Sequence, residues 1–172
     1  MAGIAKFQKV SFEQFKSDWM KNMEGKGLDL QKIYDEIRLP ERGTAGSAGY
    51  DFFAPSDIEI EYIDALIIPT GIRCEFFDPA WFLNIVPRSG QGFKSGIHLA
   101  NTCGIIDSDY FHADNEGHIM IKLVHDSAIG QNTIFEVQAG KAFAQGIFMP
   151  YGLSVDDNAA GERTGGFGST SQ

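Results

Sequence analysis

Cysteine, positive charge and long apolar runs are all scarce in this sequence of 172 residues. Its 2 cysteines, Cys74 and Cys103, lie far apart without the paired spacing of a zinc site, so neither a disulfide scaffold nor structural zinc is expected. The 14 lysines and arginines are outnumbered by 23 acidic residues, and the net charge of -9 argues against binding to duplex nucleic acid, which needs a basic face. Any bound phosphate must therefore be held locally, by a few cations, backbone amides or a metal ion.

The sequence also lacks membrane segments and histidine-based metal motifs. Residues 1–10 contain no apolar core of a signal peptide, and no later apolar run reaches the roughly 18 residues of a membrane span. We therefore expect a cytoplasmic protein that does not bind membranes. The histidines form no HxxxH or HExxH pattern, so each is expected to be a surface or strand residue rather than a ligand: His98, His112, His118 and His125.

The first 38 residues have a helical pattern. Between residues 11 and 24, large apolar side chains recur at steps of three and four residues, and Ser11 with Gln14 forms a capping box, which predicts a helix. Asp29 can cap a second, shorter helix. The apolar face can pack on the core, on a neighbouring subunit or on a partner protein, and core packing is the favoured interpretation. Residues 1–38 are thus expected to form a helical N-terminal extension.

A β domain is expected over residues 39–155, where short apolar runs are broken by Gly, Pro, Asp and Asn at the spacing of sandwiches and barrels. No long helices alternate with these runs, which argues against a parallel α/β sheet. The expected strands are 50–54, 57–62, 65–68, 71–77, 81–87, 97–100, 104–107, 117–125, 131–137 and 142–149. Residues 156–172 are polar and glycine-rich, so we expect a flexible C-terminal arm that only a ligand orders.

The most informative stretch runs from Asn101 to Tyr110. Asn101 and Gly104 flank a tight reversal and β-branched residues follow, which predicts the tip of a β-hairpin whose backbone amides can read a planar ligand edge. Two-residue periodicity puts Asp107 and Asp109 on one face, and the aromatic ring of Tyr110 comes next. This order fits a nucleoside site, although a surface turn closed by Asp-Ser-Asp has the same composition.

Two junctions upstream offer groups suited to a phosphate or its counterion. Residues 49–51, Gly-Tyr-Asp, combine an accessible backbone with a carboxylate, although a simple loop-to-strand junction looks the same. Residues 87–90, Pro-Arg-Ser-Gly, with Lys94 and Gly96 after them, offer a guanidinium, a hydroxyl and free amides, the parts of an anion nest. Arg88 can equally form a structural salt bridge.

Two stretches near the C-terminus complete the set. In residues 140–145, a turn leads into a strand where Gln145 can present its amide to a ligand, or can simply satisfy a backbone group. Residues 163–170, Arg-Thr-Gly-Gly-Phe-Gly-Ser-Thr, combine unhindered amides, hydroxyls, a positive charge and a ring, without the GxxxxGK[ST] pattern of a P-loop. A disordered tail is the alternative for this last stretch, but such a tail has no reason to contain Phe167.

Taken together and in this order, the five stretches resemble the signature motifs of the homotrimeric dUTPase family, the deoxyuridine triphosphate nucleotidohydrolases. The match comprises residues 48–51, 87–90 with 94 and 96, 101 with 104–110, 140 with 144–145, and 163 with 165–170. The resemblance implies a mainly β fold, a distorted jelly roll of the dUTPase-like β-clip type, and a homotrimer with active sites shared among three chains. It also implies hydrolysis of dUTP to dUMP and pyrophosphate, with Mg²⁺ as cofactor.

The same resemblance assigns roles to individual residues. Asp107 is expected to orient and deprotonate the attacking water, and Asp51 to reach Mg²⁺ through water. Tyr110 is expected to stack on the deoxyribose and exclude ribonucleotides. Other residues are expected to bind substrate: Asn101, Gly104 and Ile106 around the uracil, and Arg88, Ser89, Gly90 and Gln145 at the α- and β-phosphates. On an arm from another subunit, Arg163, Ser169 and Thr170 are expected to close over the γ-phosphate, with Phe167 stacked on the base and Gly168 also in contact with substrate.

This chain departs from the family pattern at four places. Residues 111–116 intervene after Tyr110, so this loop can contact a partner or a subunit differently. The fourth motif lacks its usual acid and arginine. Arg163 lies one residue closer to Phe167 than is common, and Cys103 stands where many members have proline.

Two other functions are compatible with these residues. dCTP deaminase shares the fold, but the Gly-Phe-Gly-Ser-Thr arm favours a dUTPase. The alternative of a different class is a regulatory trimer that binds nucleotide and gates a protein partner, with docking at the N-terminal helices or at residues 111–116. Release of pyrophosphate from dUTP separates a catalyst from a binding module.

Overall fold

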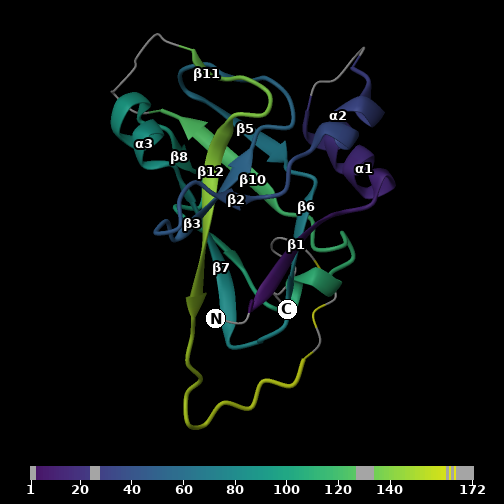
Figure 1. Cartoon of the computed structure of the whole chain (residues 1–172), viewed down its shortest axis with the longest axis vertical. Coiled ribbons are helices and arrows are strands. Elements are labelled where there is room, and N and C mark those ends of the chain that lie inside the picture. Colours follow the sequence, from purple (N-terminus) through teal and green to yellow (C-terminus); the bar gives the residue numbers. More distant parts are fainter. Residues whose placement is uncertain (1–2, 24–27, 127–133, 162, 164, 166–172) are drawn as a thin grey trace.

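Antiparallel strands form the framework of the chain in the computed structural model, which describes residues 3–23, 28–126, 134–161, 163 and 165. The largest sheet has the order β2-β3-β12-β7-β9, a second has β5-β10-β8, and two pairs, β1-β6 and β11-β4, complete the set. In Figure 1, β12 runs down the middle of the molecule. The strands are β1 (Ala5–Lys9), β2 (Glu41–Arg42), β3 (Gly49–Phe53), β4 (Ile58–Ile60), β5 (Asp64–Pro69), β6 (Ile72–Phe76), β7 (Trp81–Pro87), β8 (His98–Leu99), β9 (Gly104–Ile106), β10 (Met120–His125), β11 (Phe135–Val137) and β12 (Ala142–Pro150).

This arrangement confirms the expected mainly β, jelly-roll-like fold. Short strands such as β4, β9 and β11 alternate buried and exposed residues, as the two-residue period of a half-buried strand requires. The core between the sheets contains the fully buried side chains of Phe52, Leu83 and Phe143. β7 has the predicted bounds, whereas β10 begins only at Met120.

The elements that were not predicted from the sequence include β1, β2 and a short helix, α3 (Ser89–Ser95). β1 pairs with β6, with Ala5 opposite Phe76. Phe7 is the only large apolar side chain in β1, so the alternating pattern that reveals a strand is weak there. Residues 89–90, expected as a Ser-Gly turn, instead begin α3, which ends at Gly96 with a φ of 67°.

The two predicted N-terminal helices are present as α1 (Phe12–Asn22) and α2 (Leu30–Glu36). Both predicted caps are confirmed: the Ser11 hydroxyl accepts a hydrogen bond from the Gln14 N–H, and the Asp29 carboxylate accepts one from the Lys32 N–H, each at 3.1 Å. Among the described residues, no helix is long and apolar enough to cross a membrane.

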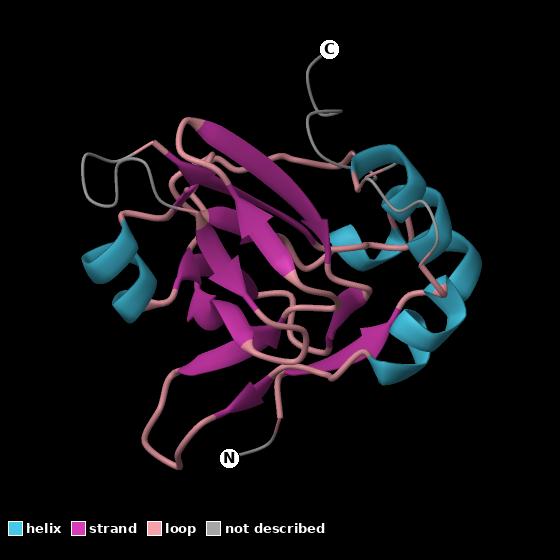
Figure 2. Cartoon of the chain, turned by 90° about the horizontal axis from the view of Figure 1, so that it is seen from above, coloured by secondary structure: helices cyan, strands magenta, loops and turns pink. Residues whose placement is uncertain are grey.

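Core packing accounts for the apolar face of α1. Phe15 and Trp19 are fully buried, with their ring centroids 5.3 Å apart. Figures 1 and 2 show α1 and α2 together on one side of the sheets and α3 on the other. The N-terminal segment therefore shares the hydrophobic core of the β domain.

The start of α1 packs against the loop that follows Tyr110. The Ser11 hydroxyl and backbone N–H both donate to the Glu116 carboxylate, at 2.6 and 2.7 Å. Arg73 lies 3.9 Å from the same carboxylate, and its guanidinium stacks on Phe111 at 4.4 Å from the ring centroid. Residues 111–116 are therefore not a separate surface loop: together with the short 3-10 helix η1 (Tyr110–His112) they form one surface with the N-terminal extension.

Replacing Glu116 by glutamine is expected to lower the free energy of unfolding at pH 7 by about 1 kcal/mol, because a half-exposed carboxylate that accepts two hydrogen bonds is lost. Burial raises the pKa of Glu116, but the two hydrogen bonds from Ser11 outweigh burial and hold the pKa below its usual value. A carboxylate with a lowered folded pKa stabilises the protein above its unfolded pKa, and this contribution disappears as the pH falls through the folded pKa.

Chemical denaturation over a pH series tests this expectation. The difference in the free energy of unfolding between the wild type and Glu116→Gln should be present at neutral pH and vanish in acid. Glu61→Gln, an exposed position for which the described residues offer no side-chain partner, is the matched control and should show no difference. A penalty for Glu116→Gln that stays constant down to about pH 3 would contradict the assigned role of the carboxylate.

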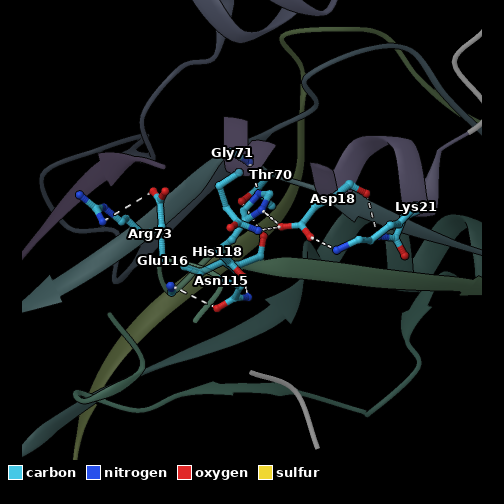
Figure 3. A network of polar contacts seen from close by, with 12 residues as sticks. Asp18, Lys21, Thr70, Gly71, Arg73, Asn115, Glu116 and His118 are labelled. Atoms are coloured by element: carbon cyan, nitrogen blue, oxygen red, sulfur yellow. Dashed lines mark hydrogen bonds and ion pairs between the residues drawn. The ribbon is translucent and has the colours of Figure 1, made fainter. Parts of the chain in front are cut away.

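A buried polar network fastens α1 to the core (Figure 3). The His118 Nδ1–H donates to Asp18 Oδ2 at 2.7 Å, and His118 Nε2 accepts the Gly71 N–H at 2.8 Å. These two contacts require the neutral ring with its hydrogen on Nδ1. Burial raises the pKa of Asp18, but hydrogen bonds from His118 and Gln14 outweigh burial and lower the pKa. The expectation that His118 is a surface or strand residue is wrong, because it is buried in this network.

Candidate active site

The tight turn at residues 101–103 connects two sheets. β8 pairs with β10, where Leu99 lies opposite Leu123, and β9 pairs with β7, where Ile106 lies opposite Leu83. The predicted β-hairpin is therefore wrong, since the two strands that flank the turn belong to different sheets. Turn formers followed by β-branched residues reveal the strands but do not specify their partners.

A cavity of about 380 Å³ opens beside this turn, and we call it the turn cavity. Three residues expected to bind substrate line it: Asn101, Gly104 and Ile106. A Cβ at Gly104 would lie 3.2 Å from the Ile85 Cβ, so glycine allows β9 to pack closely on β7 at the cavity wall. Most of the remaining lining consists of apolar side chains from β5, β7, β8 and β10, and the size suits a small ring-shaped ligand.

Asp107 and Asp109 share a cationic partner just beyond β9. Arg163 Nη2 lies 2.7 Å from Asp107 Oδ2, and Arg163 Nε lies 3.1 Å from Asp109 Oδ1. Both carboxylates thus point toward one group, but Asp107 follows β9 and Asp109 lies in a turn, so the two-residue strand period that the sequence predicted is not the cause. Arg163, expected at a γ-phosphate in the site of another subunit, here contacts two carboxylates of its own chain.

Tyr110 is buried behind these carboxylates. Its hydroxyl donates to the His118 carbonyl oxygen at 2.9 Å and accepts a hydrogen bond from Asn115 Nδ2 at 2.8 Å. The Arg163 guanidinium lies 5.4 Å from the ring centroid. Burial raises the pKa of Tyr110, so the hydroxyl remains a donor at neutral pH. The loop at residues 111–116 therefore helps to orient the ring that was expected to stack on a sugar.

Sheet register brings three of the sequence motifs together. β12 lies between β3 and β7, so Gln145 faces Asp51 on one side and Val86 on the other. Gln145 Nε2 donates to the Pro87 carbonyl oxygen at 3.2 Å. Arg88 Nε lies 3.2 Å from Asp51 Oδ1, so the guanidinium forms a salt bridge while remaining about half exposed.

A second cavity, of about 470 Å³, opens at the start of α3. Its lining includes Arg88, Ser89, Gly90 and Lys94, which combine positive charge with a hydroxyl and with backbone N–H groups that the first turn of a helix leaves unpaired. We call it the basic cavity. It shares no lining residue with the turn cavity.

Asp51 is the metal ligand candidate. Within the described residues, no three His, Cys, Asp or Glu side chains converge to hold a metal ion. A single carboxylate beside a basic cavity suits Mg²⁺ that is carried by substrate phosphates, because Mg²⁺ is usually held by one or two carboxylates together with phosphate oxygens and water.

Two site residues were missed from the sequence, and four cannot be placed. Asp18 and Asn22, both on α1, line the turn cavity. Their four-residue spacing beside the buried Phe15 and Trp19 was the available signal, because it puts a polar pair next to the face that packs on the core. The expected substrate residues on the glycine-rich arm lie outside the described residues: Phe167, Gly168, Ser169 and Thr170.

Known proteins are similar to this chain in both sequence and fold. The dUTPase family model matches residues 35–171. The deoxyuridine 5'-triphosphate nucleotidohydrolase of Tolumonas auensis is 40% identical over 158 residues, which cover 88% of this chain and 98% of that protein. The crystal structure of dUTPase from Streptococcus mutans has a TM-score of 0.63 at 28% identity and covers 88% of this chain and 98% of its own. A mutant dUTPase from phage phi11 of S. aureus, 17% identical, has a TM-score of 0.61 and covers 91% and 97% of the two chains. The chain therefore belongs to the dUTPase family of dUTP diphosphatases.

Proposed function

We propose that this enzyme hydrolyses dUTP to dUMP and pyrophosphate through water activated by Asp107, and so keeps dUTP low and supplies dUMP. The observation that supports this mechanism is that residues lining the turn cavity are followed directly, along the chain, by a carboxylate. Asn101, Gly104 and Ile106 line a cavity of about 380 Å³, and Asp107 follows directly at the end of the same strand. A base held in the turn cavity brings the rest of the nucleotide toward this carboxylate.

The proposed chemistry depends on position and charge. Phosphoryl transfer needs an in-line nucleophile and neutralisation of the charge that builds on the leaving group. Asp107 orients the water and takes its proton. Arg88, Ser89, Gly90 and Gln145 bind the α- and β-phosphates, and the partly exposed guanidinium of Arg88 in the basic cavity supports this assignment.

Arg163 is proposed to contact the γ-phosphate, with Phe167 on the base and Gly168, Ser169 and Thr170 closing over the phosphates. Its present partners are the carboxylates of Asp107 and Asp109. Binding of substrate then exchanges carboxylate oxygens for phosphate oxygens, both of which suit a guanidinium. The same exchange leaves Asp107 able to receive a proton.

Asp51 is proposed to hold Mg²⁺ through water. The phage phi11 structure is described as showing the coordination of a structural Mg(II) ion in that protein. When bound with the triphosphate, the ion neutralises part of the phosphate charge. For the chain itself, the Asp51 carboxylate offers the required oxygen ligand beside Arg88.

A homotrimer with shared active sites is proposed because the residues assigned to one substrate molecule line two separate cavities of a single chain. The turn cavity and the basic cavity share no lining residue, yet one dUTP molecule must meet both sets of side chains. Neighbouring chains can bring the two cavities together. A protein partner, if one binds, is proposed to use the surface that α1 and residues 111–116 form jointly.

A panel of dUTP, dTTP, dCTP and UTP, each with and without Mg²⁺, tests this function. We expect release of pyrophosphate from dUTP with Mg²⁺ at a rate at least about 100-fold above that of the other nucleotides, since a site that hydrogen-bonds the correct nucleotide leaves those polar groups unpaired with a wrong one. Release of ammonia from dCTP would identify a deaminase instead. Tight binding of dUTP without release of pyrophosphate would identify a regulatory binding module.

A further inference from the structure

We propose that Asn22, on helix α1, contacts the base in the turn cavity and is a specificity-determining residue for the pyrimidine. This inference rests on the function proposed above and extends it to a part of the chain that the family motifs do not include. The family model matches residues 35–171, whereas α1 ends at residue 22. The α1 side of the cavity therefore lies outside the residues that the family model matches.

The lining of the turn cavity supports a direct contact. Asn22 and Asp18 line the same cavity as Asn101, Gly104 and Ile106, the residues assigned to the uracil. At about 380 Å³, the cavity lies near the lower end of the range for small-molecule sites. A polar side chain on the wall of such a site contributes to orientation and selectivity.

The hydrogen bond that the Asn22 side chain makes within α1 leaves part of its amide available. Its Nδ2 donates to the Asp18 carbonyl oxygen at 2.8 Å. This bond uses one of the two Nδ2 hydrogens. Among the described residues, no group donates to Asn22 Oδ1. The free oxygen can accept a hydrogen bond from the base or from a water molecule that bridges to it.

The polar network in Figure 3 keeps this wall in position. The Asp18 carboxylate accepts hydrogen bonds from His118 and from Gln14, both at 2.7 Å. The Tyr110 hydroxyl donates to the His118 carbonyl oxygen, so α1 and the ring expected at the sugar are attached to the same residue. A preorganised wall binds a ligand with a smaller loss of conformational entropy than a mobile one.

Product inhibition of the full-length enzyme separates the base from the phosphates. dUMP carries the pyrimidine and pyrophosphate does not, so the inhibition constants of these two products report on the two ends of the site. For Asn22→Ala we expect the dUMP inhibition constant and the KM for dUTP to rise about 3- to 10-fold, the range for one lost hydrogen bond, with kcat unchanged. The pyrophosphate inhibition constant should not change.

A steric variant and matched controls keep the test decisive. Asn22→Phe adds a ring at the cavity wall and should raise the dUMP inhibition constant more than Asn22→Ala does. The pyrophosphate inhibition constant should again stay unchanged. Ser17→Ala and Ser17→Phe, at an exposed position on the same helix, should resemble the wild type. Thermal melts of all four variants establish that α1 remains folded.

Each outcome has a defined meaning. If the wild type hydrolyses dUTP but both Asn22 variants keep the wild-type dUMP inhibition constant, the contact is absent and only this inference fails. Equal losses of affinity for dUMP and for pyrophosphate would also overturn the inference, because they indicate a general disturbance of the site. If the wild type neither hydrolyses dUTP nor binds dUMP, the proposed function fails as well.

Discussion

Replacing Asp107 by asparagine is expected to slow dUTP hydrolysis by at least about 100-fold while nucleotide binding persists, because the amide cannot take a proton from water. Asparagine keeps the shape of the side chain and one acceptor oxygen. The Arg163 guanidinium, 2.7 Å from Asp107 Oδ2, therefore retains a hydrogen-bond partner. Rates of pyrophosphate release, together with the dissociation constant of a nonhydrolysable dUTP analogue, measure the two effects separately.

Asp109→Asn is the matched control for this prediction. Asp109 binds the same guanidinium, at 3.1 Å, but follows the expected water-activating residue by two positions. We expect a much smaller loss of rate than for Asp107→Asn. Persistent turnover in Asp107→Asn would refute its role as the general base. Loss of turnover only in Asp109→Asn would move that role to the second carboxylate.

A chain that ends at Ala160 is expected to lose dUTP turnover by about 100-fold or more, because transition-state charge is left without its cation and water enters the site. The truncation removes Arg163, which contacts both Asp107 and Asp109, together with the glycine-rich residues that follow it. Gly161, the first residue removed, is exposed, and the carboxylates that Arg163 contacts are themselves about half exposed, so the loss to the core is small. The melting temperature and the oligomeric mass should therefore change little.

A second chain that ends at Gly165 separates the contribution of Arg163 from that of the remaining arm. It keeps the guanidinium but lacks Phe167 and Ser169. We expect it to be nearly as inactive as the shorter chain if the arm closes over the substrate. Recovery of full activity in the Gly165 chain would assign the whole effect to Arg163. Full activity of the Ala160 chain would contradict any role for the arm.

Local chemistry made several features predictable. Ser11 and Asp29 cap their helices because a side-chain oxygen two or three residues before an unpaired N–H can satisfy it, whatever the rest of the protein does. β7 was delimited correctly because a β-rich apolar run ends at Pro87, which cannot donate to a ladder. Family membership was also readable, since five motifs in a fixed order involve only the sequence.

Long-range pairing limited the prediction of the site. β8 and β9 look like a hairpin because alternation and turn residues are the same whether two strands pair with each other or with distant partners. β1 was missed since its stability comes from β6, which lies far along the chain. For the same reason, the spacing of Asp18 and Asn22 could not indicate that α1 reaches a cavity beside residue 101.

The sequence by itself therefore determined the helix caps, most strands, the family and the residues assigned to dUTP. Only the tertiary structure decided that α1 lines the turn cavity, that Glu116 and His118 hold α1 there, and that Arg163 contacts Asp107. The physical reason is the range of the interactions. Caps and alternation act within a few residues and are written in order along the chain, whereas cavities and ion pairs depend on distant segments that meet only after folding.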